Sequence, residues 1–239
     1  MNSLILSAGL GTRLLPLTKN CPKCLMPFGE FKIIDFWINY SKSLNCQNIY
    51  INTYYLADMV IDYLSNRYPN EIKFINETKL HGTAGTLINL INNLNSFDDF
   101  FIVHADNFSI FNAVDFYNKF LHRPDYCVGT IMSFITDRPK DCGILETENN
   151  LMMNIHEKVD HPPSNLANAA AYIFDKNLIA KIKNSNYSDI AADILPMFFG
   201  KINIYHNDIY HRDIGYIDDY KNSLKFYEKN KQLHKDYLP

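Results

Sequence analysis

The regular alternation of short apolar runs with amphipathic segments restricts the fold of this chain more than any other feature. In the first half, strand-like runs are separated by segments with the apolar spacing of helices. Alternation of this kind predicts βαβ units, and hence an α/β fold with a Rossmann-like, mixed and mostly parallel sheet covered by helices on both faces. The strand-like runs are Asn2–Ser7, Gln47–Thr53, Ile72–Ile75 and Phe100–His104, and the helical segments are Ile34–Ser43, Leu56–Arg67, Thr86–Leu94 and Val114–His122.

The second half has a different pattern, because its strand-like runs follow one another at short turns such as Asn149-Asn150. This pattern predicts a small antiparallel extension of the sheet. Asp189 is expected to cap a helix that Pro196 ends or kinks, and Ile217–Asn230 is expected to form a closing helix. The strand-like runs are Tyr126–Ser133, Gly143–Glu146, Leu151–His156 and Ala169–Phe174.

Composition excludes several classes of function. The 239 residues are 47% hydrophobic, which is enough for a full core, and the formal net charge is −3 without a basic run, so we expect no nucleic-acid groove. No apolar stretch approaches the ~18 residues of a membrane span, and we find no signal peptide. Together with an odd number of cysteines, five, these features predict a cytoplasmic protein with reduced thiols.

The first strand-like run leads into a glycine-rich loop, Ser7-Ala8-Gly9-Leu10-Gly11-Thr12-Arg13. In a parallel sheet, ligands bind at the carboxyl ends of the strands, and glycines there let backbone N–H groups approach phosphate oxygens. A dinucleotide fingerprint is excluded because Leu14 stands where its third glycine would be, and a Gly-Lys-Ser/Thr sequence occurs nowhere. Arg13 and the downstream Lys23 could hold a triphosphate; the alternative is a tight turn with two solvated basic residues.

Three further segments have both a functional and a structural interpretation. Asp106 follows a buried strand. A carboxylate there either binds magnesium beside phosphates or caps the next loop. Residues 81–86 form either a ligand loop or an N-terminal cap before a helix. The pair Glu157-Lys158 is by itself typical of a solvated surface. Cys21 and Cys24 have zinc or redox spacing, but no second close pair accompanies them.

The segment Gly9-Leu10-Gly11-Thr12-Arg13-Leu14, with Pro16-Leu17-Thr18 and Pro22-Lys23, resembles the signature of the sugar-1-phosphate nucleotidylyltransferases. The resemblance extends from about residue 1 to residue 219 and is strongest to short bacterial guanylyltransferases for mannose or heptose 1-phosphate. It implies the nucleotide-diphospho-sugar transferase fold, which is GT-A-like. It also implies one domain over residues 1–239, with a nucleotide-binding part over about 1–125 and a sugar-binding part over about 126–239.

The resemblance also implies roles for individual residues. Arg13 and Lys23 would be catalytic, and Asp106 and Asp213, the latter in Asp213-Ile214-Gly215, would bind Mg²⁺. The sugar phosphate would be bound by Gly143, Glu157, Lys158 and Asn168. The nucleotide would be bound by Leu6, Ala8, Gly9, Gly11, Thr12, Gly82, Thr83, Ala84, Gly85, Thr86 and Asp106.

The chain departs from the family pattern at several of these motifs. Ala105 replaces the glycine before Asp106, Ala170 replaces the glycine of Asn-Ala-Gly, and Tyr216-Ile217 replaces Thr-Pro after the last glycine. Val159 stands where the family has a proline after Lys158. These changes bear on the backbone near the metal and on the width of the sugar pocket, so they leave the sugar undecided.

The resulting expectation is a Mg²⁺-dependent enzyme that transfers a nucleoside monophosphate, GMP from GTP, to a sugar 1-phosphate of mannose or D-glycero-D-manno-heptose type. Its partners would be the nucleoside triphosphate and the sugar 1-phosphate, with no nucleic acid or membrane partner. The sequence does not decide between a monomer and a homo-oligomer. The alternatives are a cytidylyl- or uridylyltransferase with another phosphorylated acceptor, or a non-catalytic nucleotide-binding module. The resemblance also suggests surface polysaccharide precursors, such as those of capsule or lipopolysaccharide.

Overall fold

A computed structural model describes residues 1–96 and 98–233, and these form two compact units. Unit 1 contains Met1–Leu80, Val103–Ala113 and, within the described chain, residues 210–233. Unit 2 contains His81–Ile102 and Val114–Ile209. The predicted division of one domain near residue 125 stays a prediction, and the last six residues of its second part lie outside the described residues.

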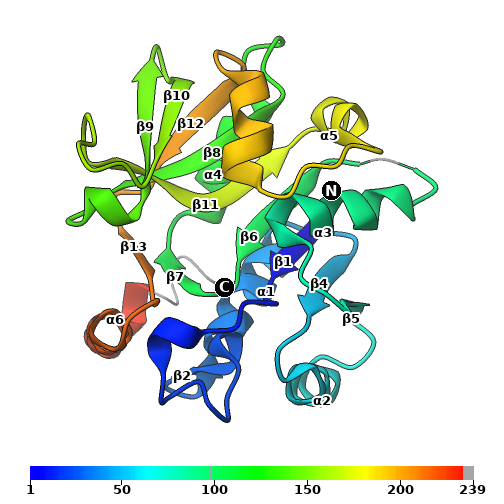
Figure 1. Ribbon diagram of the computed structural model, residues 1–239, viewed down its shortest axis with the longest axis vertical. Helices are drawn as coiled ribbons and strands as arrows, with labels where there is room; N and C mark the ends of the chain where they lie inside the picture. Colours follow the sequence, from blue (N-terminus) through cyan, green and yellow to red (C-terminus); the bar gives the residue numbers. More distant parts are fainter. Residues whose placement is uncertain (97, 234–239) are drawn as a thin grey trace. The chain divides into compact units, whose positions relative to one another are not determined.

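Unit 1 is built on parallel strands. In its part of the sheet the strand order is β5-β4-β1-β6, and both β1–β4 and β4–β5 are parallel, with Ile5 opposite Ile51 and Ile51 opposite Phe74 (Figure 1). The apolar runs that predicted these strands are buried in β1 and β4, as expected for strands covered on both sides. The bounds are β1 Asn2–Leu6, α1 Ile33–Ser43, β4 Ile49–Thr53, α2 Ala57–Arg67, β5 Ile72–Asn76 and β6 Phe100–His104.

Aromatic residues form the core beside α1. Trp37 donates a hydrogen bond from Nε1 to the carbonyl of Asn107 at 2.8 Å, and the Tyr40 ring stacks on Phe111 with centroids 4.1 Å apart. Phe108 packs at 5.1 Å from Phe36. These contacts hold in place the short segment that follows β6. The remaining elements of unit 1 are η1 Thr12–Leu14, η2 Lys23–Leu25, β2 Pro27–Phe28, β3 Phe31–Lys32, β7 Asn107–Ile110, β13 Tyr210–Asp213 and α6 Ile217–Lys229.

Unit 2 contains the predicted antiparallel extension. Its strand order is β6-β11-β8-β12-β10-β9, with antiparallel β11–β8, β10–β12 and β9–β10 pairs and a parallel β12–β8 pair. The prediction of a mixed, mostly parallel sheet with an antiparallel extension is therefore confirmed. The bounds are α3 Gly82–Asn92, α4 Ala113–Leu121, β8 Gly129–Ile135, η3 Pro139–Asp141, β9 Gly143–Glu148, β10 Leu151–Glu157, β11 Leu166–Phe174, α5 Lys176–Ile182, η4 Ile190–Ile194, η5 Leu195–Phe198 and β12 Ile202–His206.

Two local predictions in unit 2 are confirmed. Asn149 and Asn150 have φ of 51° and 62° between β9 and β10, the left-handed pair that a tight hairpin turn requires. Asp189 caps η4 by accepting a hydrogen bond from the Ala192 N–H, and Pro196 falls at the start of η5, where the winding changes from π to 3₁₀. Sequence patterns did not predict β2, β3, β7, β12, β13 or α5.

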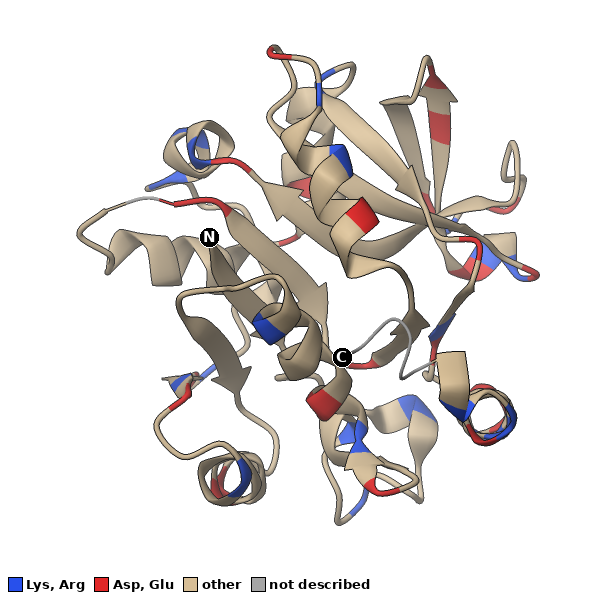
Figure 2. Cartoon of the chain, turned by 180° about the vertical axis from the view of Figure 1, so that it is seen from behind, with Lys and Arg blue, Asp and Glu red and all other residues tan. Residues whose placement is uncertain are grey.

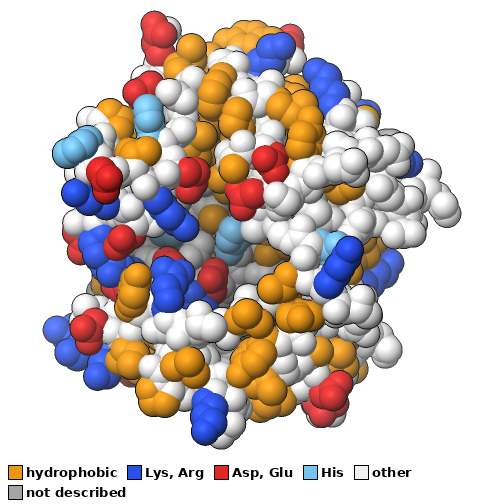
Figure 3. All heavy atoms as spheres, in the orientation of Figure 1, with side chains coloured by type: hydrophobic (Ala, Val, Ile, Leu, Met, Phe, Trp, Pro, Cys, Tyr) orange, Lys and Arg blue, Asp and Glu red, His pale blue; other side chains and the backbone are white. Residues whose placement is uncertain are grey.

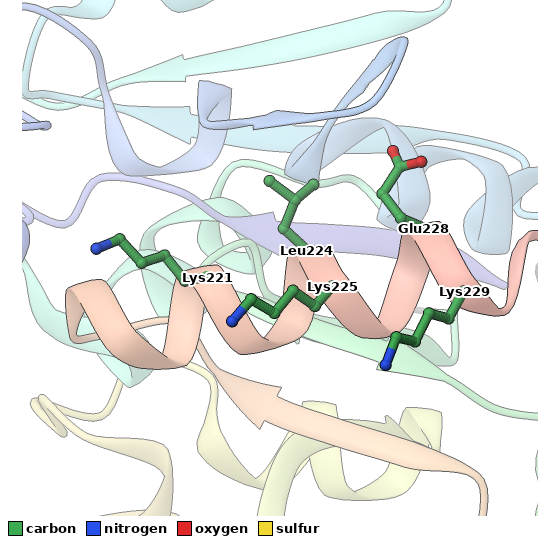
Figure 4. A pocket seen from close by; sticks show the side chains of 5 residues that line it. All are labelled: Lys221, Leu224, Lys225, Glu228 and Lys229. Atoms are coloured by element: carbon green, nitrogen blue, oxygen red, sulfur yellow. The ribbon is translucent and has the colours of Figure 1, made fainter.

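The surface beyond the sheet carries mixed charge. Basic and acidic residues are interspersed along α6 (Figure 2), and a shallow pocket is lined by five residues of this helix (Figure 4). These residues are Lys221, Leu224, Lys225, Glu228 and Lys229, and they include none of the predicted site residues. Within the described chain, no helix is both long and apolar enough to cross a membrane.

Candidate functional site

The glycine-rich loop after β1 is tied to its own unit at both ends. Ser7 donates its backbone N–H to Asn52 Oδ1 at 2.6 Å, and its hydroxyl contacts the Asn52 carbonyl. Further along, the buried Thr18 donates its hydroxyl to the Gly11 carbonyl at 2.7 Å. Gly11 has φ of 65°, and a Cβ there would meet Thr18 at 3.0 Å, so the turn requires glycine.

The residues predicted to bind the nucleotide lie in and beside this loop. Leu6 ends β1, Ala8 is buried, Gly9 has open space around its Cα, and Thr12 begins η1. Leu10 of the same loop is exposed to solvent. Hydrophobic side chains also gather in the lower part of the face that Figure 3 shows.

Lys23 joins two carboxylates that are far apart in the sequence. Its Nζ donates to Asp106 Oδ2 and to Asp213 Oδ1, each at 2.8 Å. The lysine side chain is only 7% exposed, whereas the side chains of Asp106 and Asp213 are 39% and 45% exposed. The two aspartates predicted to share one metal ion therefore converge on one point in unit 1, where a side-chain cation lies between them.

The topology of unit 1 explains this convergence. Ala105 follows β6 and donates its N–H to the Leu6 carbonyl at the end of β1, at 2.9 Å. The chain then turns into β7, whose Asn107 lies opposite Asp213 in the antiparallel pair with β13. Ile214 donates its N–H to the Asp106 carbonyl at 3.1 Å. Asp106 and Asp213 are thus fixed by backbone hydrogen bonds on both sides.

Arg13 extends the cluster on its exposed side. Its Nη2 lies 3.5 Å from Asp213 Oδ2, and its guanidinium lies over the Tyr216 ring at 5.1 Å. A Cβ on Gly215 would meet Asp213 Oδ2 at 2.9 Å and Arg13 Cζ at 3.1 Å. The residue after Ile214 must therefore be small for this arginine and this carboxylate to approach each other.

The charges in this cluster shift one another's titration. Burial lowers the pKa of Lys23, but Asp106 and Asp213 together raise it by more than burial lowers it, so the net shift of the pKa is upward. Burial raises the pKa of Asp106, but Lys23 and His104 outweigh burial, and the pKa falls to about 2. Burial lowers the pKa of the nearby His211 to about 3, so this imidazole is neutral at pH 7.

The carboxylate pair suits magnesium. Mg²⁺ prefers oxygen ligands and is commonly bound through one or two carboxylates together with substrate phosphates. No group of three or more metal-binding side chains occurs in the part of the chain that the structure describes. Asp106 and Asp213 would thus need oxygens from the substrates to complete the coordination. The ammonium already lying between their oxygens shows that this position accepts a cation.

The prediction that residues 81–86 form a loop before a helix starting at Thr86 is wrong, because α3 begins at Gly82. Its first turn is hydrogen-bonded to a neighbouring segment of unit 2: Ala84 donates its N–H to the Ser188 carbonyl at 3.1 Å, and Thr83 Oγ1 accepts from the Ile190 N–H at 2.8 Å. Gly82, at φ of 77°, allows this approach, since a Cβ there would lie 2.2 Å from the Ser188 carbonyl oxygen. Gly82, Thr83, Ala84, Gly85 and Thr86 therefore form the first turns of a helix.

Glu157 and Gly143 lie together in unit 2. They are opposite each other at the ends of β10 and β9, and a Cβ on Gly143 would lie 2.1 Å from Glu157 Oε1. The glutamate side chain thus rests over the glycine. Lys158 has φ of 49° and donates its N–H to the Cys142 carbonyl at 3.3 Å, which turns the chain out of the strand.

Asn168 is held from both ends of its amide. Its Nδ2 donates to the Tyr172 hydroxyl at 2.9 Å, and its Oδ1 accepts from the Ala170 N–H at 2.8 Å. The register of β11 against β8 shifts between Asn168 and Tyr172, and Ala170 lies at φ of 52°. This bulge turns the asparagine away from the regular pleat. Ala170 thus adopts a left-handed conformation that glycine would adopt without strain.

Several residues of these clusters were not singled out as site residues from the sequence. Ser7 lies in the quoted glycine-rich loop and Thr18 in the quoted signature, so their position near the glycines was a usable signal. Asn52 lies in β4, and Tyr172 lies four residues after Asn168 in β11; no local pattern marks either as a site residue. Asn52 reaches Ser7 because β4 pairs with β1, whereas Tyr172 reaches Asn168 because of the bulge between them in β11.

Comparison with known proteins identifies the family of the chain. A family model described as nucleotidyl transferase matches residues 2–230. A putative mannose-1-phosphate guanyltransferase of Sulfolobus acidocaldarius is 31% identical over 227 residues, which cover 92% of this chain and 61% of that protein. A CTP:phosphoglutamine cytidylyltransferase of Campylobacter jejuni is 46% identical over 76 residues, 32% of this chain and 30% of that protein.

Among solved structures, a putative glucose-1-phosphate thymidylyltransferase from Bacillus anthracis matches with a TM-score of 0.83 at 22% identity, covering 95% of this chain and 94% of that one. At this identity the match supports the fold alone. The chain spans less than two thirds of the length of several curated relatives that it matches. With a family match over almost its whole length, the chain belongs to the nucleotidyl transferase family, as the signature after β1 predicted.

Proposed function

We propose that this protein transfers GMP from GTP to a sugar 1-phosphate of mannose or D-glycero-D-manno-heptose type and releases pyrophosphate. The convergence of Asp106, Asp213 and Lys23 beside the glycine-rich loop is the observation that carries the proposal. It supplies two carboxylates for a metal and a cation for phosphate at the end of a parallel strand, where ligands of such sheets bind. The 31% identity to a putative mannose-1-phosphate guanyltransferase supports the choice of base and sugar.

The reaction needs no general base. A sugar phosphate has a second pKa near 6 and is already mostly dianionic at pH 7, so one of its oxygens can attack the α-phosphorus directly. Pyrophosphate leaves from the opposite side. Mg²⁺, when bound by Asp106 and Asp213, would neutralise charge on the phosphates of both substrates. Lys23 and Arg13 would stabilise the α-phosphate and the leaving pyrophosphate, so catalysis consists of positioning and electrostatics.

The unit 2 residues supply contacts for the acceptor. In this proposal Glu157 accepts hydrogen bonds from sugar hydroxyls, Lys158 binds the sugar phosphate, and Asn168 contacts the ring while Tyr172 fixes its amide. Gly143 leaves room for the glutamate. The first turns of α3, residues 82–86, would help to read the base, as the resemblance to the family implies.

A second candidate is supported by one specific observation. The identity to the phosphoglutamine cytidylyltransferase reaches 46%, although over only 76 residues. This favours CTP as the donor and a phosphorylated acceptor that is not a sugar. Both candidates use the same chemistry at the α-phosphorus. The odd number of cysteines, five, supports a cytoplasmic location for either.

Pyrophosphate release in the presence of Mg²⁺ tests the proposal. GTP, CTP, UTP, dTTP and ATP should each be combined with a panel of hexose and heptose 1-phosphates and with phosphoglutamine. Release with GTP and a mannose-configured phosphate is expected. Release with CTP and phosphoglutamine would replace the first candidate by the second. If folded protein released no pyrophosphate with any of these substrate pairs, a non-catalytic nucleotide-binding module would be favoured.

A further inference from the structure

The charged groups of unit 1 already satisfy one another. Lys23 contacts one oxygen of Asp106 and one of Asp213, and Arg13 lies near the other oxygen of Asp213. The proposed function assigns the two cations to phosphates and the two carboxylates to a metal. Each group is therefore paired with a side chain that it would have to exchange for a ligand.

Geometry makes this exchange necessary for Lys23. Its Nζ lies 2.8 Å from both Asp106 Oδ2 and Asp213 Oδ1. A divalent ion such as Mg²⁺ shared by the same oxygens would need about 2.0–2.1 Å to each, and two cations cannot occupy that position together. An ion shared in this way would therefore displace the ammonium.

Exposure shows from which side the exchange can occur. The lysine side chain is 7% exposed, whereas the two aspartate side chains are 39% and 45% exposed. A hydrated ion can thus approach the carboxylates from solvent while the ammonium leaves on its flexible four-carbon stem. Since an ammonium leaving a buried position needs another acceptor, a phosphate oxygen at the neighbouring glycine-rich loop is the partner it would take.

We propose that Lys23 is a built-in counter-ion of the Asp106–Asp213 pair and that metal and triphosphate bind by exchanging with it, each making room for the other. This inference rests on the proposed function for the identity of the ligands. It predicts that metal and nucleotide bind cooperatively and that, because coupling is reciprocal, each tightens the other by the same factor.

Manganese binding provides the test, with free Mn²⁺ measured by electron paramagnetic resonance and no acceptor present. Wild type, Lys23→Met, Lys23→Gln and Lys23→Arg should be titrated with and without non-hydrolysable analogues of GTP and CTP. Lys19→Met is the matched control, because Lys19 is an exposed lysine of the same loop and lies outside the cluster. Circular dichroism should establish that each variant is folded.

Removal of the counter-ion should tighten Mn²⁺ binding in the absence of nucleotide by about tenfold in Lys23→Met and Lys23→Gln, within the usual range of coupling between sites. Lys23→Arg and Lys19→Met should stay within about twofold of wild type, since both keep the charge at position 23. Adding Asp106→Asn to Lys23→Met should abolish the gain. Equal affinity in wild type and Lys23→Met would overturn the proposal.

If neither neutral variant folds, the wild-type titration still decides. Mn²⁺ and at least one nucleotide analogue must then strengthen each other's binding about tenfold, and independent binding would overturn the proposal. Failure of the proposed function is visible separately, as absence of pyrophosphate release from wild type. Tighter Mn²⁺ binding in Lys23→Met without pyrophosphate release from wild type would support the counter-ion proposal and reject the proposed reaction.

Discussion

The two groups of candidate residues are held in place by different forces. In unit 1, Lys23, Asp106 and Asp213 are charged and hold one another. In unit 2, Asn168 is held by the Tyr172 hydroxyl and by a backbone N–H, and Glu157 rests against a glycine. One group depends on ion pairs, and the other depends on neutral hydrogen bonds and strand register.

This difference has consequences for ligand binding. Charges that are partly removed from water need counter-charges at all times, so the unit 1 cluster must rearrange when ionic ligands arrive. The Asn168 amide of unit 2 is neutral and can keep one geometry with or without a ligand, because it retains further hydrogen-bonding capacity. We therefore expect substitutions in unit 1 to act mainly on turnover and metal binding, and substitutions in unit 2 to act on the affinity for the acceptor.

The largest expected effect is that of Asp106→Asn. Loss of this carboxylate should lower kcat by about 10²–10³, the range seen when one stabilising group is removed from a transition state. The fold should persist, because Asp106 is tied through its backbone. Steady-state pyrophosphate release checks this, with Asp218→Asn, an exposed aspartate of the same unit, as the control. A near-wild-type kcat would show that Asp106 is not a catalytic residue.

Unit 2 is tested by Asn168→Ala and Tyr172→Phe. Alanine should raise KM for the acceptor by about tenfold, the equivalent of one lost hydrogen bond to a ligand, and leave KM for the triphosphate unchanged. Phenylalanine should raise acceptor KM less, because the amide stays but loses one of its two restraints. If Tyr172→Phe lowered kcat alone, Tyr172 would not act through Asn168.

A still smaller effect is expected for Gly143→Ala. The new methyl group would meet Glu157 Oε1, the far end of a flexible side chain, which can move away. Stability should thus change by less than about 1 kcal/mol, while acceptor KM rises a few-fold. Gly82→Ala is the informative contrast, because its methyl group would meet the Ser188 backbone at φ of 77° and should destabilise the protein by several times more. Thermal denaturation and acceptor titration distinguish the two.

Much of the fold could be predicted from local patterns, whereas the shape of the site could not. Periodicity located β1, β4 and α1 to within two residues, because their apolar positions are buried in the way the spacing requires. The start of α3 was missed because Ser188, about a hundred residues away, supplies the acceptor for its first turn. The pairing of β7 with β13, which brings Asp106 and Asp213 together, likewise depends on register between distant segments.

Acid pH should separate the two groups through the sign of their pKa shifts. Lys23 and its neighbours lower the pKa of Asp106 from 3.8 to about 2, so ionised Asp106 stabilises the folded state. This contribution is present above about pH 4 and is lost as pH falls toward 2. Asp106→Asn should therefore lose its stability deficit relative to wild type over that interval. Urea denaturation between pH 2 and pH 5 measures this difference, and a constant deficit would contradict the ion pair.

Glu157 should show the opposite and smaller dependence. Partial burial, with Asp189, raises its pKa although Lys158 opposes the shift, so folding favours the protonated form. The stabilising effect is present at low pH and is lost as pH rises through the ordinary glutamate range, near 4.3. Glu157→Gln should therefore gain stability relative to wild type as pH rises from about 4 to 7, by only a few tenths of a kcal/mol, because the residue is exposed and solvent screens its charge. Urea denaturation of both proteins across that range would show the gain. A loss of stability instead would mean that Glu157 is held by attraction, as Asp106 is, and that the two groups do not differ in kind.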